Sequence, residues 1–418
     1  MFFDHLPLGC LVDYIKAVRY GDFMKPIKLG ILGARRGLAF ARGSVKGKSS
    51  DLELACICDF SDEKIKNAAK KFDVDFYTKF DDMLKTDIDA VVLANYFHEH
   101  AFFALKAMKA GKHVISETLP AATMAEAVML CDTVEETGMT YMFAENCPFT
   151  KIGMAMKTEF DAGIIGKPIY GEGEYFHPFN AEGFKGIAPS KDHWRNFIPS
   201  TYYSSHSISP LMFMTGAKPI RVNALSVANE KLLKNTDRKN DPLAIMLCTM
   251  NDGSIFKITG WGNAGGYSSW YKLVGEKGTI EAPRAYACGY FGNGCLTVSL
   301  NENETDDSKR KISSYKPEWP KGAEEAKNAS HGGADYFINQ NFIDAIKSGK
   351  HPKYFDVYDG AAMSAVAILG WRSALSNGIP FDIPDFHDKA VRENFRNDYS
   401  TPFPNDKGWP LIPTTIKK

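Results

Sequence analysis

Short apolar runs alternate with amphipathic segments along the first third of the chain. Each run is followed by a segment in which apolar residues recur with helical spacing. Strands that alternate with helices in this way are parallel and are joined by right-handed crossovers. The predicted strands begin at Ile27 and span 52–58, 90–94, 113–117 and 140–144, and the predicted helices span 38–43, 100–110 and 124–137.

The pattern changes after about residue 147, where longer strands replace the alternation. Turn-forming segments at 251–253 and 275–278 separate some of these strands, as in hairpins. The second part of the chain therefore predicts an open, mostly antiparallel sheet accompanied by helices. The predicted strands are 168–177, 220–228, 243–250, 254–260 and 271–274, and the helices are 151–162, 334–348 and 357–375.

A glycine-rich turn, Gly33 to Gly37, follows the first predicted strand directly. Such a turn at the start of a helix places backbone N–H groups against a pyrophosphate. About 22 residues past Gly37, the second strand ends in Asp59, whose carboxylate can accept the ribose hydroxyls of NAD and would repel the extra phosphate of NADP. The spacing departs from G-x-G-x-x-G, because Arg35 stands where the second glycine is expected. These features predict an NAD-binding Rossmann domain with cofactor contacts from Gly33, Ala34, Arg35, Arg36, Gly37 and Asp59.

Charge and cysteine content limit the possible partners. Fifty basic residues balance fifty acidic ones, so no global field attracts nucleic acid or an anionic membrane. No apolar run is long enough to span a bilayer. Eight cysteines without a C-x-x-C pair are typical of a reduced, cytoplasmic protein. Asp4, His5 and Asp13 interrupt the apolar start of the chain, which argues against a secretion signal. We interpret residues 1–25 as an N-terminal arm, or as an upstream start with Met24 opening the usual fold.

Several segments together resemble the Gfo/Idh/MocA oxidoreductases over roughly residues 26–386. The matching segments are 33–37, Asp59, 95–100, 110–114 and 275–281. The resemblance implies a Rossmann domain over 26–147 and a C-terminal α/β domain over 148–386, whose open, mostly antiparallel sheet carries the sugar site and forms homo-oligomers. Residues 387–418 form a polar tail. The carboxyl ends of the parallel strands, and the segment that the family places beside the cofactor, add Asn95, His98, His100, Glu117, Glu145 and Asn146 to the predicted cofactor contacts.

One departure from the family narrows the resemblance. The usual Glu-Lys-Pro segment after the fifth strand reads Glu117-Thr118-Leu119-Pro120-Ala121-Ala122, without the lysine. Segments 145–147, 175–177, 193–196, 203–206, 331–335 and 356–359 instead look like the NAD-dependent α-N-acetylgalactosaminidase branch. Ser205 replaces a threonine of that branch, and Ile208-Ser209-Pro210 replaces Leu-Gly-Pro.

These segments contain the candidate catalytic and substrate-binding residues. Removing a hydride from a sugar carbon requires a base for the hydroxyl proton. His206 is the first candidate, because imidazole exchanges protons near neutral pH and a loop of small residues would leave the ring accessible. Tyr203 and Tyr175 are further catalytic candidates that relay a proton or hold a hydroxyl. Each of these residues has a purely structural alternative. The predicted substrate contacts are His177, Trp194, Arg195, His331 and Asp335, of which Asp335 is also a plausible helix N-terminal acid.

Other chemistries have weaker support in the sequence. His98 and His100 are spaced wrongly for two metal ligands on one helix face, so we predict no metal. No G-x-S-x-G turn is present. A conventional carboxylate pair stays open, since any two acids can meet in space.

Three functions remain after these considerations. The first, which we favour, is NAD-dependent oxidation of a ring hydroxyl, at carbon 3, of a sugar or glycoside. The second is a redox-neutral glycosidase in which the same oxidation acidifies the neighbouring C–H, the leaving group is eliminated, water adds and the hydride returns. The third is a dinucleotide-binding sensor without turnover. The sequence names neither the sugar nor its anomer.

Overall fold

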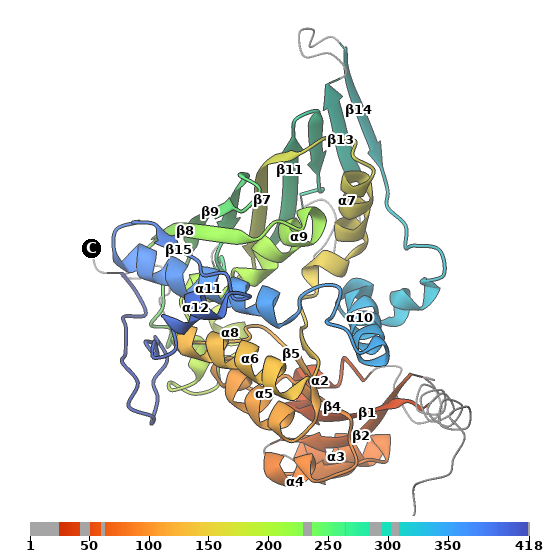
Figure 1. Ribbon diagram of the computed structural model, residues 1–418, viewed down its shortest axis with the longest axis vertical. Coiled ribbons are helices and arrows are strands. Elements are labelled where there is room, and N and C mark those ends of the chain that lie inside the picture. The colour runs from red at the N-terminus through yellow and green to blue at the C-terminus, as the bar shows by residue number, and fades with distance from the viewer. Residues whose placement is uncertain are drawn as a thin grey trace, which may run out of the picture.

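The computed structural model contains two sheets that share a layer of helices (Figure 1). It describes residues 25–41, 51–59, 63–228, 236–263, 265–284, 294–301 and 309–416. The predicted N-terminal arm, apart from Lys25, lies outside the described residues.

The first sheet has six parallel strands in the order β3-β2-β1-β4-β5-β6. This order reverses direction between β1 and β4, which creates the crevice where doubly wound sheets bind ligands. The strands are β1 Ile27–Leu32, β2 Leu52–Cys58, β3 Asp75–Tyr77, β4 Ala90–Leu93, β5 His113–Ser116 and β6 Tyr141–Phe143. The helices are α2 Ala34–Gly37, α3 Glu63–Phe72, α4 Phe80–Leu84, α5 His100–Lys109 and α6 Met124–Thr137.

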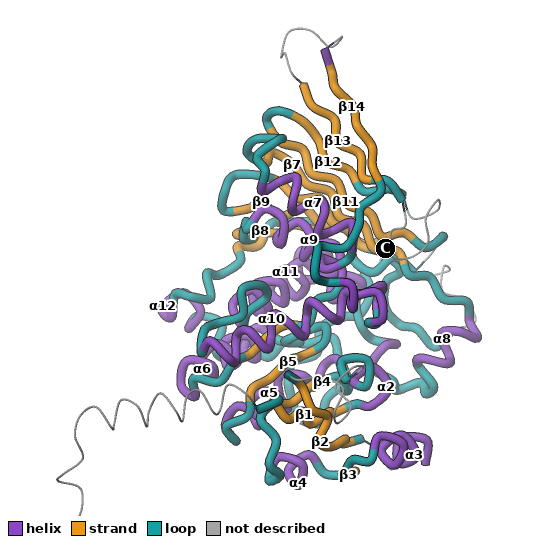
Figure 2. Tube along the Cα trace, turned by 90° about the vertical axis from the view of Figure 1, so that its right-hand side faces the viewer, coloured by secondary structure: helices purple, strands orange, loops and turns teal. Residues whose placement is uncertain are grey.

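The second sheet has nine strands in the order β14-β13-β12-β11-β7-β10-β9-β8-β15, and it extends away from the first sheet (Figure 2). Only the β7–β10 pair is parallel among the described pairings, which confirms the open, mostly antiparallel sheet. The strands are β7 Pro168–Phe176, β8 Pro219–Ser226, β9 Ala244–Met250, β10 Ile255–Thr259, β11 Ser268–Gly275, β12 Gly278–Glu281, β13 Leu296–Asn301, β14 Arg310–Tyr315 and β15 Phe381–Asp382. The helices are α7 Lys151–Asp161, α8 Ala181–Ile187, α9 Ser205–Thr215, α10 Ala334–Ser348, α11 Val357–Leu375 and α12 Lys389–Glu393.

Helix α11 joins the two halves, because it packs on α6 of the first sheet and on β8 of the second. It is apolar on nearly all sides and almost wholly buried, as expected of a helix enclosed by two layers. Asp356 caps its N-terminus by accepting hydrogen bonds from the N–H groups of Tyr358 and Asp359.

Two local predictions were wrong. The helix expected at 38–43 instead occupies α2, Ala34–Gly37, because the chain turns into a helix directly after Gly33. His206 was placed in a loop of small residues, but it lies in the first turn of α9. The serines of this segment have weak helix propensity, and complete burial of the helix overrides it.

The C-terminal tail folds back over the first sheet rather than extending into solvent. Phe403 is 2% exposed, and burying a side chain of this size contributes roughly 1.5–3 kcal/mol. Arg372 on α11 pairs with Asp398 through two hydrogen bonds of 2.5 and 2.7 Å. Arg392 is buried and donates to Asp132 and Glu135 of α6 at 2.7 and 2.6 Å.

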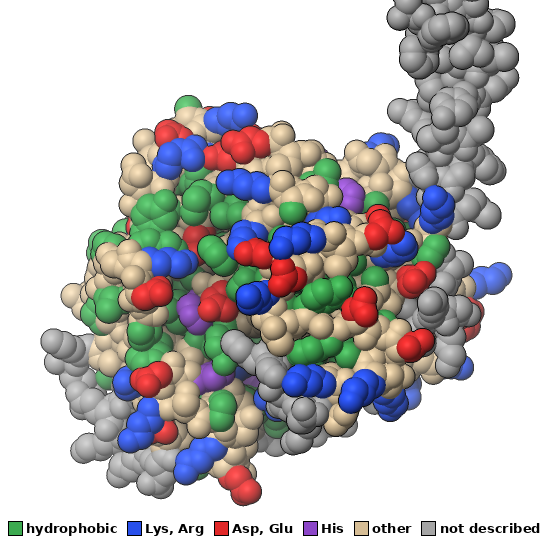
Figure 3. Space-filling model, turned by 90° about the horizontal axis from the view of Figure 1, so that it is seen from below, with side chains coloured by type: hydrophobic (Ala, Val, Ile, Leu, Met, Phe, Trp, Pro, Cys, Tyr) green, Lys and Arg blue, Asp and Glu red, His purple; other side chains and the backbone are tan. Residues whose placement is uncertain are grey.

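Charged side chains of both signs are interspersed on the face seen from below (Figure 3). This distribution agrees with the balanced composition and with the absence of a single-signed patch on that face. Among the described helices, none combines the length and apolar character needed to cross a bilayer.

The tail contact generates a prediction about stability. The hydrogen bond from Arg392 lowers the pKa of Glu135 to about 2 from 4.5, so this pair stabilises the fold above about pH 5 and the contribution is lost as pH falls toward 2. Arg392→Gln should lower the free energy of unfolding by about 2 kcal/mol at pH 7. It should also make the free energy of unfolding depend less on pH between about pH 5 and pH 2. Thermal and urea unfolding between pH 3 and 7 measure both effects.

The matched control is Arg396→Gln. Arg396 pairs with the same Asp132, but its side chain is 40% exposed, so its loss should change stability by less than about 1 kcal/mol. Equal losses for the two variants would contradict the assigned importance of Arg392.

Candidate active site

The glycine-rich turn follows β1 and lies beside the end of β4, where the strand order of the first sheet reverses. Gly33 has a φ of +91°, and a Cβ there would lie 2.4 Å from the backbone carbonyl of Ala94. Only glycine therefore lets the turn approach the end of β4 so closely. Asp59 accepts a hydrogen bond from the N–H of Ala34 at 2.7 Å, which fixes its carboxylate beside the turn.

A pocket of about 360 Å³ opens where the carboxyl ends of β4 and β5 meet the end of β7 and the start of α9. It is built from both sheets, so each domain contributes one wall. Twelve of the residues predicted from the sequence line it: Arg36, Asn95, His100, Glu117, Asn146, Tyr175, His177, Trp194, Arg195, Tyr203, His206 and His331.

The first-sheet wall contains buried polar atoms that have no hydrogen-bond partner among the described residues. These atoms are Oδ1 of Asn95, Nε2 of His100 and Oγ1 of Thr118. Unpartnered buried polar groups destabilise a fold unless a ligand or water satisfies them. Together with the close approach at Gly33 and the carboxylate of Asp59, they fit a dinucleotide that lies along this edge.

Arg36 connects the turn to both domains. Its Nε lies 2.6 Å from Glu117 after β5, and its Nη1 lies 2.7 Å from Asp335 in the first turn of α10. Burial opposes the charge of Arg36, but the two carboxylates outweigh burial and raise its pKa. Burial alone would raise the pKa of Asp335, but hydrogen bonds from His331 and Arg36 lower it to about 2. Arg36 and Asp335 are therefore charged at neutral pH.

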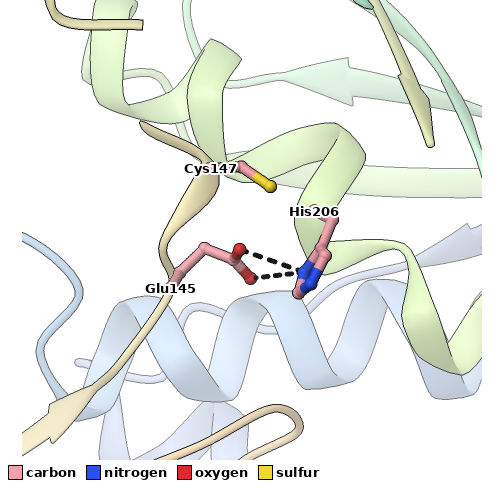
Figure 4. A group of neighbouring side chains, drawn as sticks. All are labelled: Glu145, Cys147 and His206. Atoms are coloured by element: carbon pink, nitrogen blue, oxygen red, sulfur yellow. Dashed lines mark hydrogen bonds and ion pairs between the residues drawn. The ribbon is translucent and has the colours of Figure 1, made fainter. Parts of the chain in front are cut away.

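His206 points from α9 toward Glu145, which follows β6 (Figure 4). Nδ1 of the imidazole lies 3.0 and 3.1 Å from the two carboxylate oxygens. Glu145 is fully buried and His206 is 7% exposed. A carboxylate beside Nδ1 holds the proton on that nitrogen, which leaves Nε2 as the proton acceptor.

Cys147 completes a group whose ligand atoms all lie within 4.8 Å of one another (Figure 4). Glutamate, cysteine and histidine at this spacing are compatible with a metal ion. However, the Glu145–His206 contact has hydrogen-bond length, and burial raises the pKa of Cys147 well above 9.0, so its sulfur is a neutral thiol. We interpret the group as a hydrogen-bonded cluster, and the expectation of no metal stays a prediction.

An aromatic wall supports the imidazole from the other side. The ring of Tyr175 meets the ring of His206 edge-on at 4.5 Å, and Tyr203 lies 5.0 Å from the same ring. Tyr203 also stacks on Phe97, which stacks on Trp194 at 5.1 Å. Burial raises the pKa of Tyr203, so its phenol stays protonated at neutral pH and can donate a hydrogen bond to a hydroxyl.

The remaining predicted residues do not line the pocket. Gly33, Ala34, Gly37 and Asp59 form and support the turn, Arg35 is exposed, Glu145 and Asp335 lie behind His206 and Arg36, and His98 stacks on Phe403 of the tail. Thr118, which the sequence marked only as the place of the family's lysine, also lines the pocket. Sequence reasoning missed Ala94, Phe97, Phe179, Ile187 and Trp261 as pocket residues. Apolar and aromatic residues of this kind carry no signal that separates a pocket wall from a core.

Family models match both halves of the chain. Residues 27–145 match the oxidoreductase family with an NAD-binding Rossmann fold. Residues 246–392 match the C-terminal domain of glycosyl hydrolase 109. A glycosyl hydrolase family 109 protein of Shewanella amazonensis is 26% identical over 402 residues, which cover 87% of this chain and 86% of that protein. A protein of the same description from Streptomyces coelicolor is 24% identical over 381 residues, which cover 81% of this chain and 79% of that protein.

Solved structures share the fold. Levoglucosan dehydrogenase in complex with NADH and levoglucosan is 20% identical, with a TM-score of 0.69 over 86% of this chain and 100% of that chain. The myo-inositol 2-dehydrogenase of Lactobacillus plantarum is also 20% identical, with a TM-score of 0.66 over 86% of this chain and 100% of that chain.

The position of Asp59 generates a prediction about cofactor choice. The unaltered protein should prefer NAD over NADP, because the carboxylate would meet the extra phosphate. Asp59→Asn should narrow this preference by on the order of tenfold, since it removes the charge but keeps an oxygen for the N–H of Ala34. Titration calorimetry with both nucleotides measures the two affinities.

Asp59→Ala provides the comparison, because it removes both the charge and the hydrogen bond to the turn. It should also narrow the preference and should weaken NAD binding further. Equal or tighter binding of NADP by the unaltered protein would show that Arg35 or Arg36, rather than Asp59, sets the choice.

Proposed function

We propose that this chain, which matches the Gfo/Idh/MocA oxidoreductase model over residues 27–145 and the glycosyl hydrolase 109 C-terminal model over residues 246–392, oxidises a ring hydroxyl, at carbon 3, of a sugar or glycoside. The observation that carries this proposal is the His206–Glu145 pair, in which the imidazole lines the pocket and the carboxylate lies behind it. NAD bound along that edge would accept the hydride from the sugar carbon. Solved relatives with the same fold include dehydrogenases of levoglucosan and myo-inositol, which supports a sugar substrate.

His206 is the proposed base. Glu145 keeps the Nδ1 proton in place, so Nε2 takes the hydroxyl proton as the carbon is oxidised. Tyr203 and Tyr175 hold the sugar hydroxyl against this nitrogen. Glu145 was predicted to contact the cofactor, and its burial beneath His206 supports a positioning role instead. Thr118 has the place of the family's lysine but no group that could act as a base.

A second candidate has its own support. The match of residues 246–392 to the glycosyl hydrolase 109 domain favours a redox-neutral glycosidase that uses the same pocket groups. The two functions differ in whether reduced nucleotide leaves the enzyme. The third alternative, a sensor without turnover, lacks a reason for the His206–Glu145 pair.

We also propose that the protein forms homo-oligomers through the open face of the second sheet. Leu225 on β8, Ile245 and Leu247 on β9 and Ile255 on β10 are 67%, 45%, 42% and 47% exposed. Leu225 and Ile245 are direct cross-strand partners, so these side chains form one patch. Helices α9 and α11 pack against strands of this sheet, but the patch stays exposed. A second copy of the chain would cover it.

The cytoplasm is the proposed location. The six described cysteines, Cys56, Cys58, Cys131, Cys147, Cys248 and Cys295, are free thiols. Free thiols in a protein of this size are typical of a reducing compartment.

The base assignment generates a prediction. His206→Ala should lower turnover by about a hundred- to ten-thousand-fold, because a positioned acid–base group is lost. Thr118→Ala should leave most turnover intact. Single-turnover measurements with the NAD-loaded protein separate the chemical step from product release.

Glu145→Gln serves as the control for positioning. It should lower kcat about ten- to a hundredfold while KM and NAD affinity stay unchanged, whereas a cofactor contact would weaken NAD binding. If the Thr118 change proves more damaging than the His206 change, the base lies at the first-sheet wall and the assignment is reversed.

The position of oxidation generates a second prediction. Substrate deuterated at carbon 3 should react more slowly, because that C–H bond breaks. In heavy water, deuterium should enter carbon 2, whose proton becomes acidic beside a carbonyl at carbon 3. Mass spectrometry of the sugar measures this exchange, and near-ultraviolet absorbance measures reduced nucleotide.

The outcomes distinguish the candidates. Accumulating free NADH identifies an oxidoreductase, and released sugar without net NADH identifies the redox-neutral glycosidase. Hydrolysis at full rate in protein stripped of nucleotide would contradict both and would indicate a conventional carboxylate glycosidase.

A further inference from the structure

Arg195 occupies the second-domain wall of the pocket, in the segment between α8 and α9. Its guanidinium carbon lies 4.4 Å from the centre of the Trp194 ring. Trp194 is itself held by stacking on Phe97 at 5.1 Å with the rings 15° apart. A guanidinium held over an aromatic ring keeps its N–H groups available to a planar or tetrahedral oxyanion.

Three side chains whose pKa values respond to the charge of Arg195, namely His177, His193 and Tyr203, are uncharged at neutral pH. Burial lowers the pKa of His177 and of His193 to about 4, and the charge of Arg195 adds to both shifts. Burial also raises the pKa of Tyr203, which keeps the phenol neutral. Among the residues that the structure describes, no carboxylate lies within ion-pair distance of Arg195.

Two other arginines near the pocket, Arg36 and Arg238, differ from Arg195 in their surroundings. Arg36 has two carboxylates within 2.7 Å, so its charge is balanced inside the protein. Arg238 stacks over Trp261 at 4.4 Å behind the same wall, and burial, with a contribution from Arg195, lowers its pKa to about 9. The charge of Asp241 acts on Arg238 and raises its pKa, whereas Arg195 has no carboxylate at ion-pair distance among the described residues. The uncompensated positive charge of this wall therefore lies on Arg195.

We propose that the substrate of this site carries an anionic group, a carboxylate or a sulfate, which Arg195 binds. A half-buried cation without a counter-charge is unfavourable unless its ligand supplies one. The inference rests on the proposed function, since it names the class of sugar that the pocket takes. It does not depend on which of the two reactions follows.

An oxyanion near Arg195 has two sources, the sugar and the pyrophosphate of the cofactor. The sugar is favoured by the neighbours of Arg195 on the second-domain wall. Tyr203, whose phenol senses the charge of Arg195, lies 5.0 Å from the ring of His206 and 6.0 Å from the ring of Tyr175. The pyrophosphate is expected at the turn after β1, on the first-domain wall.

The test measures binding to the NAD-loaded protein by calorimetry. The probes are methyl galactosiduronates, methyl glucosiduronates and the 6-sulfated methyl galactosides and glucosides, as both anomers, each paired with its neutral methyl glycoside. We expect at least one acidic sugar to bind tenfold or more tightly than its neutral partner. Arg195→Gln should remove this difference, with a loss on the order of ten- to a hundredfold, and Arg195→Lys should retain part of it.

Arg284→Gln is the matched control. Arg284 stacks on Trp270 at 3.6 Å but lies outside the pocket, so its loss should leave the preference for the acidic sugar intact. Unchanged NAD affinity and melting temperature show that Arg195→Gln has kept its fold.

Three results would overturn the proposal. The acidic sugars bind no more tightly than their neutral partners, or Arg195→Gln leaves their advantage intact, or Arg195→Gln weakens NAD instead of the sugar, which would assign the oxyanion to the cofactor. Failure of the proposed function is separate, because the tightest acidic sugar would then bind through Arg195 without producing reduced nucleotide or a hydrolysed product.

Discussion

A buried carboxylate must have a partner, and in this protein the partner comes from the other domain. Glu145 follows the last strand of the parallel sheet and is fully buried, so the cost of removing its charge from water is large unless it is hydrogen-bonded. The imidazole of His206 provides that bond from α9, at 3.0 Å. The contact therefore fixes α9 against the edge of the first sheet. Because this edge is where a doubly wound sheet binds ligands, the same contact that joins the domains also places a base beside the predicted nucleotide.

The same need for a partner explains the charged group of Arg36, Glu117 and Asp335 on the first-sheet side of the pocket. Arg36 comes from the glycine-rich turn, Glu117 from the end of β5 and Asp335 from α10, so three separate elements meet in one charge-balanced group. Charged groups that are neutralised within the protein define the frame of the pocket. The groups that remain available are the unpartnered polar atoms of the first-sheet wall and the guanidinium of Arg195. We expect a ligand to bind where polar atoms or charges have no partner within the protein, because the ligand can supply that partner.

The sequence predicted the parallel sheet well, because buried strands and amphipathic helices have distinct periodicities. Five of its six strands were predicted, and only the short β3 was not. Helix α9 was missed as a whole, since serines around His206 favour loops and only burial makes them helical. Strands β12 to β14 were missed because their alternation is weak and β14 is exposed along its whole length. Twelve predicted site residues line the pocket, because motifs and strand ends mark polar residues. The position of Glu145 beneath His206 could not be predicted, since it depends on how two domains pack.

The loss of the family's lysine has a consequence for where the base can sit. At Thr118 the first-sheet wall offers only a buried hydroxyl. The other proton acceptors of this wall are less suited to the task, because burial lowers the pKa of His100 and Glu117 is paired with Arg36 at 2.6 Å. The second-domain wall is then the better source of the base, and the phenol of Tyr203 is unsuited because burial favours its protonated form. His206 remains, and its orientation is set by Glu145 rather than by the substrate. A base fixed in this way serves an oxidation that ends with release of reduced nucleotide as well as one that is reversed after the glycosidic bond breaks. The choice between these outcomes thus depends on how long the oxidised sugar stays in the pocket, and a strong contact between Arg195 and an acidic substrate would lengthen that stay.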